Sequence, residues 1–386
     1  MTSLKTLYFS KEHNMCFKKI KLLLSAIAIL LLTIVETEAE QNYFTSNSVI
    51  IPEIPQYTTR LGRSKPIIAV VGENSFTELT DYVVPYGVLK TSGVAEVFAL
   101  ATKVGPIQMF PALKLHPQTT VDAFDSSFPE GADYIIVPAV HRAEDSKLIS
   151  WVLSQAKKGA VIVGICDGVW VVANAGLLDG RKAVGHWYSF GDLERKFPNT
   201  AWIKNKRYIA DGNIVTTTGV TASIPVSLAI IEAIAGSGKA ASVADQIGVN
   251  DWRAEHTSNN FKLNTHHIFT AAINSISFWT HEVIEIPISN GINEISLALI
   301  ADAYSRTYRS NAVSISSSPE GVLSRNGLIV IPDKVINIPN SSKISPKLID
   351  EIKPINTLEA SLSEIANKYG QATSNFVALQ MEYPRQ

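Results

Sequence analysis

Short runs of apolar residues alternate with longer stretches in which apolar positions recur every three to four residues. The first run, PIIAVV at 66–71, contains no polar position and is typical of a strand buried on both faces of a parallel sheet. Strands that alternate with helices predict an α/β fold in which helices cover both faces of a mostly parallel sheet. The other predicted strands are 95–100, 133–137, 160–165 and 213–217, and the predicted helices are 76–92, 146–156, 169–175 and 224–235.

The chain carries a partial internal repeat, with copies that begin at Pro66 and Glu282. Both copies show a strand, a turn with Gly and Asn, an acid that opens a helix, and a second strand. We interpret residues 245–386 as a half-sized α/β region without a cysteine; the alternative is a coincidental likeness between two ordinary βαβ units. The matched features are Glu78 with Glu294, Asp81 with Leu297, and DYIIVPA at 133–139 with GLIVIPD at 327–333.

The N-terminus has the pattern of a targeting segment. Three lysines precede an apolar core at 22–35, which is short for a membrane span. Small residues place a cleavage site after Ala39, and the polar, proline-containing segment 40–65 is interpreted as a linker. The sequence thus predicts a signal peptide at 1–39 and a periplasmic or secreted protein; an uncleaved membrane anchor is the alternative.

The composition of the chain limits the binding partners and the chemistry that it can have. The net charge is −1 and the chain has no basic block, which excludes nucleic acid as the main partner. Of two cysteines, Cys16 lies in the predicted signal peptide, so Cys166 would remain without an internal disulfide partner. We expect no cofactor. His266, His267 and His281 have no further ligand at a suitable spacing, so no metal site is predicted either.

Cys166 lies in GICDG at 164–168, which joins a predicted strand directly to a predicted helix. Such a turn is a nucleophile elbow, and Gly164 and Gly168 would leave it the room it needs. The helix N-terminus would favour a thiolate, and the backbone N–H of Asp167 would face a developing oxyanion. We therefore predict a reactive thiol with a pKa below the free value of about 8.5; an inert buried thiol is the alternative.

The elbow and the residues after it resemble the ThiJ/PfpI superfamily of class I glutamine amidotransferase-like proteins. The closest likeness is to the branch found in AraC-type regulators and isonitrile hydratase. The resemblance implies a flavodoxin-like sandwich over 66–244, a small-molecule substrate or ligand, and a homodimer as one oligomeric state. It rests on Cys166, AGLLDGR at 175–181, His186-Trp187, and the strand and helix predicted at 211–234.

The resemblance also implies roles for individual residues. The family places an acid four residues before a proline on the first helix, here Asp81, where a protonated carboxyl would donate to sulfur and lower its pKa. Glu78, one turn earlier, is the competing candidate. His186 would be either a general base or a structural residue. Asp167 would either cap the helix or contact substrate.

One departure from the family bears on the chemistry. Relatives commonly have a Gly-Gly pair after the third strand, where this chain has Ala139 and Val140 and brings His141 toward the site. The change weakens the case for acyl transfer, which needs an oxyanion hole. Two functions follow from the sequence. One is a cysteine-dependent hydrolase or hydratase acting on a small carbonyl- or nitrile-like molecule, and the other is a module that binds a small molecule or senses oxidants.

Overall fold

The computed structural model describes residues 54–336 and 352–384, so the predicted signal peptide and most of the predicted linker lie outside the described residues. Residues Pro52–Gln386 form one compact unit. Within the described ranges, no helix is both long enough and apolar enough to cross a membrane. The predicted boundary between residues 244 and 245 falls inside helix α8 (Ser237–Ile247).

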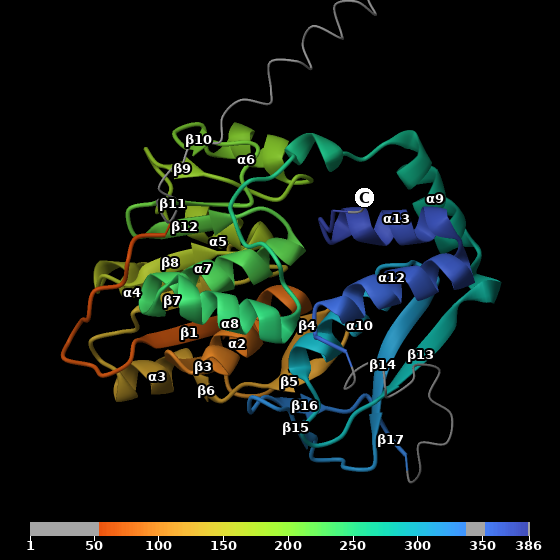
Figure 1. Cartoon of the computed structure of the whole chain (residues 1–386), viewed down its shortest axis with the longest axis horizontal. Coiled ribbons are helices and arrows are strands. Elements are labelled where there is room, and N and C mark those ends of the chain that lie inside the picture. Colours follow the sequence, from red (N-terminus) through yellow and green to blue (C-terminus); the bar gives the residue numbers. More distant parts are fainter. Residues whose placement is uncertain (1–53, 337–351, 385–386) are drawn as a thin grey trace, which may run out of the picture. The chain divides into compact units, whose positions relative to one another are not determined.

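A seven-stranded sheet organises the first part of this unit, as the alternating apolar runs predict (Figure 1). Neighbouring strands are parallel, except for the antiparallel pair at one edge, β11 with β12. In spatial order the strands are β11 (Tyr208–Asp211), β12 (Ile214–Thr217), β8 (Val161–Gly164), β7 (Tyr134–Val137), β1 (Ile67–Gly72), β3 (Glu96–Ala101) and β6 (Thr119–Thr120).

Helices cover both faces of the sheet, because successive side chains of a strand point to opposite sides. In β1, Ile68 and Val70 face one core, whereas Ile67, Ala69 and Val71 face the other. The predicted sandwich with a mostly parallel sheet is confirmed. One core is closed by α2 (Leu79–Ser92), α7 (Ser223–Ala235) and α8, and the other by α3 (Val121–Ser127), α4 (Ser146–Lys157) and α5 (Val169–Asn174).

A second βαβ unit follows, so a further α/β region is present after the sheet, as the repeat predicts. It consists of β13 (Glu282–Pro287), α10 (Glu294–Ser305) and β14 (Ser310–Ser316). Strands β13 and β14 pair in parallel, as β1 and β3 do in the first copy. The short strand β17 (Lys334–Val335) pairs in parallel with β14, just as β6 pairs in parallel with β3.

One part of the predicted repeat is wrong, because GLIVIPD is not the counterpart of DYIIVPA. GLIVIPD forms β16 (Ile329–Ile331) in a separate five-stranded sheet, whereas DYIIVPA forms β7 inside the parallel sheet. The position of β16 in its copy matches β5 (Lys114–His116) in the first. Short apolar runs look alike in sequence, and only their pairing partners distinguish them. The other strands of this sheet are β15 (Val322–Leu323), β4 (Ile107–Phe110) and β2 (Thr77–Glu78).

The two copies pair through β5 and β16 in a nearly symmetric way. Leu115 pairs with Val330, which is its counterpart in the repeat. Lys114 pairs with Ile331, the counterpart of His116. In a two-fold dimer, each interface residue likewise meets the equivalent surface of the other subunit. A single chain therefore contains an arrangement like that of a symmetric dimer.

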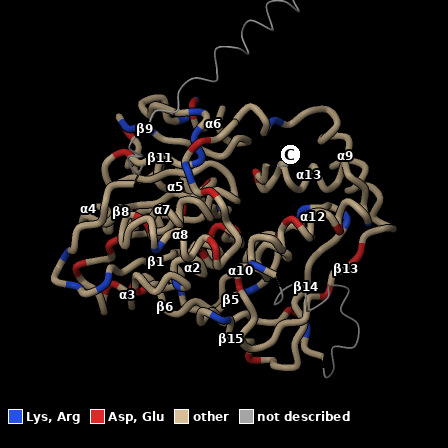
Figure 2. The backbone as a smooth tube through the Cα atoms, viewed as in Figure 1, with Lys and Arg blue, Asp and Glu red and all other residues tan. Residues whose placement is uncertain are grey.

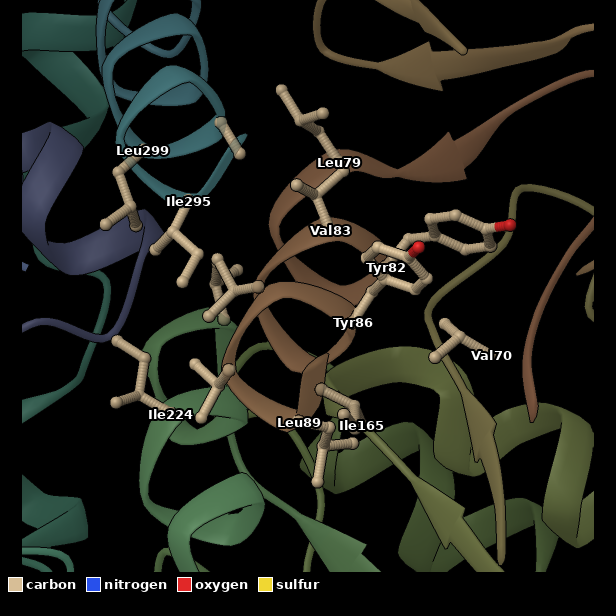
Figure 3. Close-up of a cluster of buried hydrophobic side chains, with 14 of the residues drawn as sticks. Val70, Leu79, Tyr82, Val83, Tyr86, Leu89, Ile165, Ile224, Ile295 and Leu299 are labelled. Atoms are coloured by element: carbon tan, nitrogen blue, oxygen red, sulfur yellow. The ribbon is translucent and has the colours of Figure 1, made fainter. Parts of the chain in front are cut away.

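Helix α2 is buried between helices of both copies (Figure 3), and it carries Asp81 of the candidate site in its first turn. Leu79 and Val83 of α2 belong to the same buried cluster as Ile295 and Leu299 of α10. A Cβ on Gly87 would lie 2.6 Å from Ile295 Cγ1, so glycine lets the two helices approach closely.

Residues near the end of the described chain form hydrogen bonds with the first copy. The backbone carbonyl of Glu382 accepts a hydrogen bond from Thr221 Oγ1 at 2.9 Å, and that of Leu379 accepts one from Trp187 Nε1 at 3.1 Å. Figure 2 shows Lys and Arg interspersed with Asp and Glu along the described chain. The remaining elements are β9 (Lys182–Ala183), α6 (Phe190–Lys196), β10 (Ala201–Trp202), α9 (Thr265–Ile276), α12 (Asn356–Tyr369) and α13 (Gln371–Gln380).

Candidate active site

The cysteine predicted to react lies at a sharp strand-to-helix turn. Strand β8 ends at Gly164, and Cys166 begins a 3₁₀ turn that leads into α5. Cys166 has a φ of 54°, a left-handed conformation that residues with a side chain seldom adopt. A Cβ on Gly168 would lie 2.0 Å from the Val137 carbonyl oxygen, so only glycine fits there. At Gly164 the nearest atom would be a valine methyl at 3.0 Å.

Burial dominates the electrostatics of the thiol. Cys166 is 5% exposed, and burial raises the pKa of its thiol well above the ordinary value. The carboxyls of Asp81, Asp167 and Glu78 raise this pKa further, in that order, and the backbone N–H of Asp167 lowers it. The direction is opposite to the lowered pKa predicted from the elbow. Helix α5 has only 6 residues, and its dipole is weak against the loss of solvation.

Both acids proposed for the site lie at the start of α2, and each has different partners. Glu78 is the N-cap, and its Oε2 accepts a hydrogen bond from the Asp81 backbone N–H at 2.6 Å. Asp81 is fully buried, and of the nearby carboxyls it raises the pKa of Cys166 most. Both carboxyls thus act on the thiol electrostatically, but among the described residues no hydrogen bond joins Asp81 to Cys166 Sγ, so the predicted donation to sulfur is not present.

Asp81 has the environment of a neutral carboxyl. Its Oδ2 accepts a hydrogen bond from the Ala139 N–H at 3.2 Å, whereas its buried Oδ1 has no partner among the described residues. Burial raises the pKa of Asp81 well above its usual range, although the Ala139 N–H and Arg306 oppose this. If Asp81 is protonated on Oδ1, its O–H has no acceptor among the described residues.

The turn after β7 is paired with the chain that precedes α2. The Glu78 N–H donates to the Ala139 carbonyl at 2.8 Å, and the His141 N–H donates to the Phe76 carbonyl at 2.9 Å. Because the Ala139 N–H is engaged by Asp81, two of the backbone donors in this turn are unavailable to an oxyanion.

His186 and Asp167 both line the site, with different surroundings. His186 is 9% exposed, and neither ring nitrogen has a hydrogen-bond partner among the described residues, so no carboxylate orients it as a base. Asp167 Oδ2 accepts a hydrogen bond from Ser189 Oγ at 2.9 Å, and its buried Oδ1 is unpartnered. No side chain caps α5, so the capping role considered for Asp167 is wrong.

These groups surround a cavity of about 420 Å³. Its walls are mostly apolar, with a few polar groups beside the thiol, as in many small-molecule sites. The described residues contain no cluster of three or more His, Cys, Asp or Glu side chains that could hold a metal ion. The lining residues are Phe76, Glu78, Phe110, Ala139, Val140, His141, Cys166, Asp167, His186, Val220, Arg306 and Gln380.

Arg306 is the charged residue of this cavity that sequence reasoning missed. It follows α10 in the second copy, which the sequence presents as lacking chemistry because it has no cysteine. Its Nη2 donates to Glu78 Oε1 at 2.6 Å, across 228 positions of the chain. A basic residue at the end of a helix is too common to predict such a role, and only the packing of α10 on α2 brings it here.

Comparisons with known proteins find similar sequences over the first copy. Residues 67–233 match the model of the DJ-1/PfpI family. The chain is 30% identical over 172 residues to an isonitrile hydratase of Pseudomonas putida, covering 43% of this chain and 72% of that protein. It is 33% identical over 105 residues to the HTH-type transcriptional regulator CdhR of Pseudomonas aeruginosa, but spans only 31% of the regulator.

Among solved structures, the crystal structure of Drosophila melanogaster DJ-1beta aligns over 48% of this chain and 100% of its own, with a TM-score of 0.44 and 21% identity. The sequence matches carry the assignment, since the hydratase is covered over most of its length at 30% identity. On these matches, the chain belongs to the DJ-1/PfpI family.

Proposed function

We propose that the protein is a cysteine-dependent hydratase that adds water to a small molecule with a carbon–nitrogen triple bond. The observation that carries this proposal is the buried Cys166 thiol near the buried Asp81 carboxyl, whose pKa is raised by burial, with the thiol at the wall of a mostly apolar cavity. A nitrile or isonitrile is uncharged and narrow, and suits such a site. The likeness to an isonitrile hydratase supports this substrate class.

The backbone around the cavity favours a hydratase over an acyl hydrolase. Acyl transfer builds up negative charge on oxygen and depends on preorganised N–H donors. Here the Ala139 and His141 N–H groups are engaged within the protein, and the Asp167 N–H lies at the thiol. Addition of S–H across a triple bond needs a proton donor instead, which Asp81 supplies.

The proposed reaction has two steps that balance with water alone. First, Cys166 Sγ bonds to the terminal carbon of the isonitrile. Asp81 gives its proton to that carbon and takes up the thiol proton, which leaves a thioimidate. Water then adds to the same carbon, one of its protons passes to nitrogen, and the other returns to sulfur as the carbon–sulfur bond breaks. The product is an N-substituted formamide.

A direct assay tests this function. Purified protein would be mixed with aliphatic isonitriles, aliphatic nitriles and simple amides, and products would be followed by proton NMR. We expect formamides from isonitriles, or carboxamides from nitriles, and no hydrolysis of amides. Hydrolysis of amides without hydration of either triple bond would contradict the proposal.

A second candidate is a module that binds a small molecule without turning it over. The raised pKa of Cys166 favours it, because a mostly protonated thiol is a weak nucleophile. Oxidant sensing is less well supported, since oxidation also proceeds through the thiolate. Calorimetry separates the candidates: a module of this kind would bind an isonitrile or a similar ligand tightly and release it unchanged.

We also propose that the protein is exported, because a lysine-rich segment directly precedes the apolar core at 22–35, as in signal peptides. The mature chain is expected to begin at Glu40. N-terminal sequencing of protein recovered from the cell envelope or medium would test this. An intact start at Met1 or Met15 in cytoplasmic protein would contradict export.

A further inference from the structure

Arg306, the C-cap residue of α10, places its guanidinium at the cavity beside Cys166, where several hydrogen bonds hold it. The Arg306 side chain is 11% exposed and lines the cavity together with Cys166. Its Nε donates to Asp302 Oδ1 at 2.6 Å and its Nη2 to Glu78 Oε1 at 2.6 Å. Asp302 is itself held by Thr80, whose Oγ1 donates to Oδ2 at 2.7 Å. Residues of both copies therefore fix the position of this positive charge.

Three buried carboxyls lie around the Arg306 guanidinium, but only two of them are hydrogen-bonded to it. Glu78 and Asp302 are bonded to Arg306, whereas Asp81 is bonded to a backbone N–H. Both oxygens of Glu78 accept hydrogen bonds, although burial and the Asp81 and Asp302 carboxyls raise its pKa well above its usual range and Arg306 opposes this. Asp81 has one oxygen without a partner. A buried carboxylate without a cation is costly, so Asp81 is the group best suited to keep its proton.

We propose that Arg306 is a positioning residue of the Cys166 site. It fixes the Glu78 and Asp302 carboxyls through hydrogen bonds, leaves Asp81 without a hydrogen-bonded cation, and supplies the positive charge that stabilises the Cys166 thiolate when it forms. The role of Asp81 in this proposal rests on the proposed hydratase function, but the effect of Arg306 on the thiol does not require a substrate.

The thiol is surrounded by charged or titratable groups from several elements. Burial, and the Asp81, Asp167 and Glu78 carboxyls when they are ionised, act against the thiolate. Burial lowers the pKa of Arg306, but attraction to Asp302, Glu78 and Cys166, in that order, raises it overall. This attraction is mutual, so Arg306 also favours the thiolate. The groups that face the thiol or line the cavity are Glu78 and Asp81 of α2, His141, Asp167, His186 and Arg306.

Alkylation of Cys166 by iodoacetamide, followed by mass spectrometry across a range of pH, tests the proposal in the full chain. We expect Arg306→Gln to raise the midpoint of alkylation by about one pH unit or more, because the nearby positive charge is lost. Arg306→Lys keeps the charge and should restore a midpoint near that of the wild type. An unchanged midpoint in folded Arg306→Gln would overturn the proposal.

Lys90 provides a matched control. It follows Glu78 in the first copy at the same spacing as Arg306 follows Glu294 in the second, and it lies over the Tyr86 ring, outside the cavity lining. Lys90→Gln should leave the midpoint unchanged, and an equal shift in this variant would overturn a specific role for Arg306.

A double variant covers the case in which Arg306→Gln does not fold. Asp302→Asn with Arg306→Gln removes both charges of the pair together and keeps hydrogen-bonding groups at both positions. This variant should also show a raised midpoint, and an unchanged one would overturn the proposal. If the midpoint shifts but the wild type hydrates no isonitrile or nitrile, the hydratase function fails and the role of Arg306 at the thiol stands.

Discussion

Replacing Cys166 with alanine should reduce hydration of an isonitrile or nitrile by about 10⁴-fold or more, because the reaction then lacks its nucleophile. The only other cysteine in the sequence is Cys16, which lies in the predicted signal peptide. Asp81→Asn should reduce the rate by about 10²–10⁴-fold, because the amide retains an acceptor for the Ala139 N–H but cannot transfer a proton to carbon. Initial rates measured by NMR would give both values.

Asp122→Asn is the matched control for these substitutions. Asp122 is an exposed helix residue that bonds Lys147 and lies outside the cavity lining, so its loss should leave the rate unchanged. Thermal unfolding of each variant would show whether it is folded. A folded Cys166→Ala protein that retains a tenth of wild-type activity would contradict a covalent mechanism through this residue.

Ile295→Ala should destabilise the protein by about 2–5 kcal/mol, the usual cost of removing a large buried aliphatic side chain. Ile295 is 1% exposed and lies against Gly87, where α10 meets α2. The wild-type side chain fills a contact made possible by that glycine, and alanine would leave a cavity between the two copies. Urea denaturation, followed by circular dichroism, would measure the change in unfolding free energy.

The same measurement tests whether the second copy stabilises the first. The Ile295→Ala protein should unfold in one transition at lower urea, because α2 loses support on its α10 side. Val283→Ala is the control: Val283 lies on β13 of the same copy but is 41% exposed, and its truncation should cost about 0.5 kcal/mol or less. Equal effects of the two substitutions would argue against a specific contact at α2.

The strands and helices of the first copy could be predicted because their patterns are local. PIIAVV forms β1, and the helix predicted at 146–156 is α4 (Ser146–Lys157). The elbow was also predictable, since GICDG places a glycine at 168. A Cβ at this position would lie 2.0 Å from the Val137 carbonyl oxygen. Such features depend on neighbours in sequence or on a backbone conformation that few residues can adopt.

The assignment of β16 and the environment of the thiol were not predictable in this way. GLIVIPD and DYIIVPA are alike in composition, and only their pairing with β5 or β1 shows that they have different roles. The predicted low pKa of Cys166 followed from the turn alone. Burial and three carboxyls, which come together only in the folded chain, reverse its direction.

By itself, the sequence determined the sandwich, the position of Cys166 at the turn, and the presence of acids on the first helix, because these depend on local patterns. Only the tertiary structure decided that α10 packs on α2 and delivers Arg306 to Glu78, 228 positions away. It also decided that Asp81 is fully buried with a raised pKa, and that one of its oxygens has no partner among the described residues. The physical reason is that charge and desolvation act through space, so the protonation of a buried group depends on residues that its sequence neighbourhood does not contain.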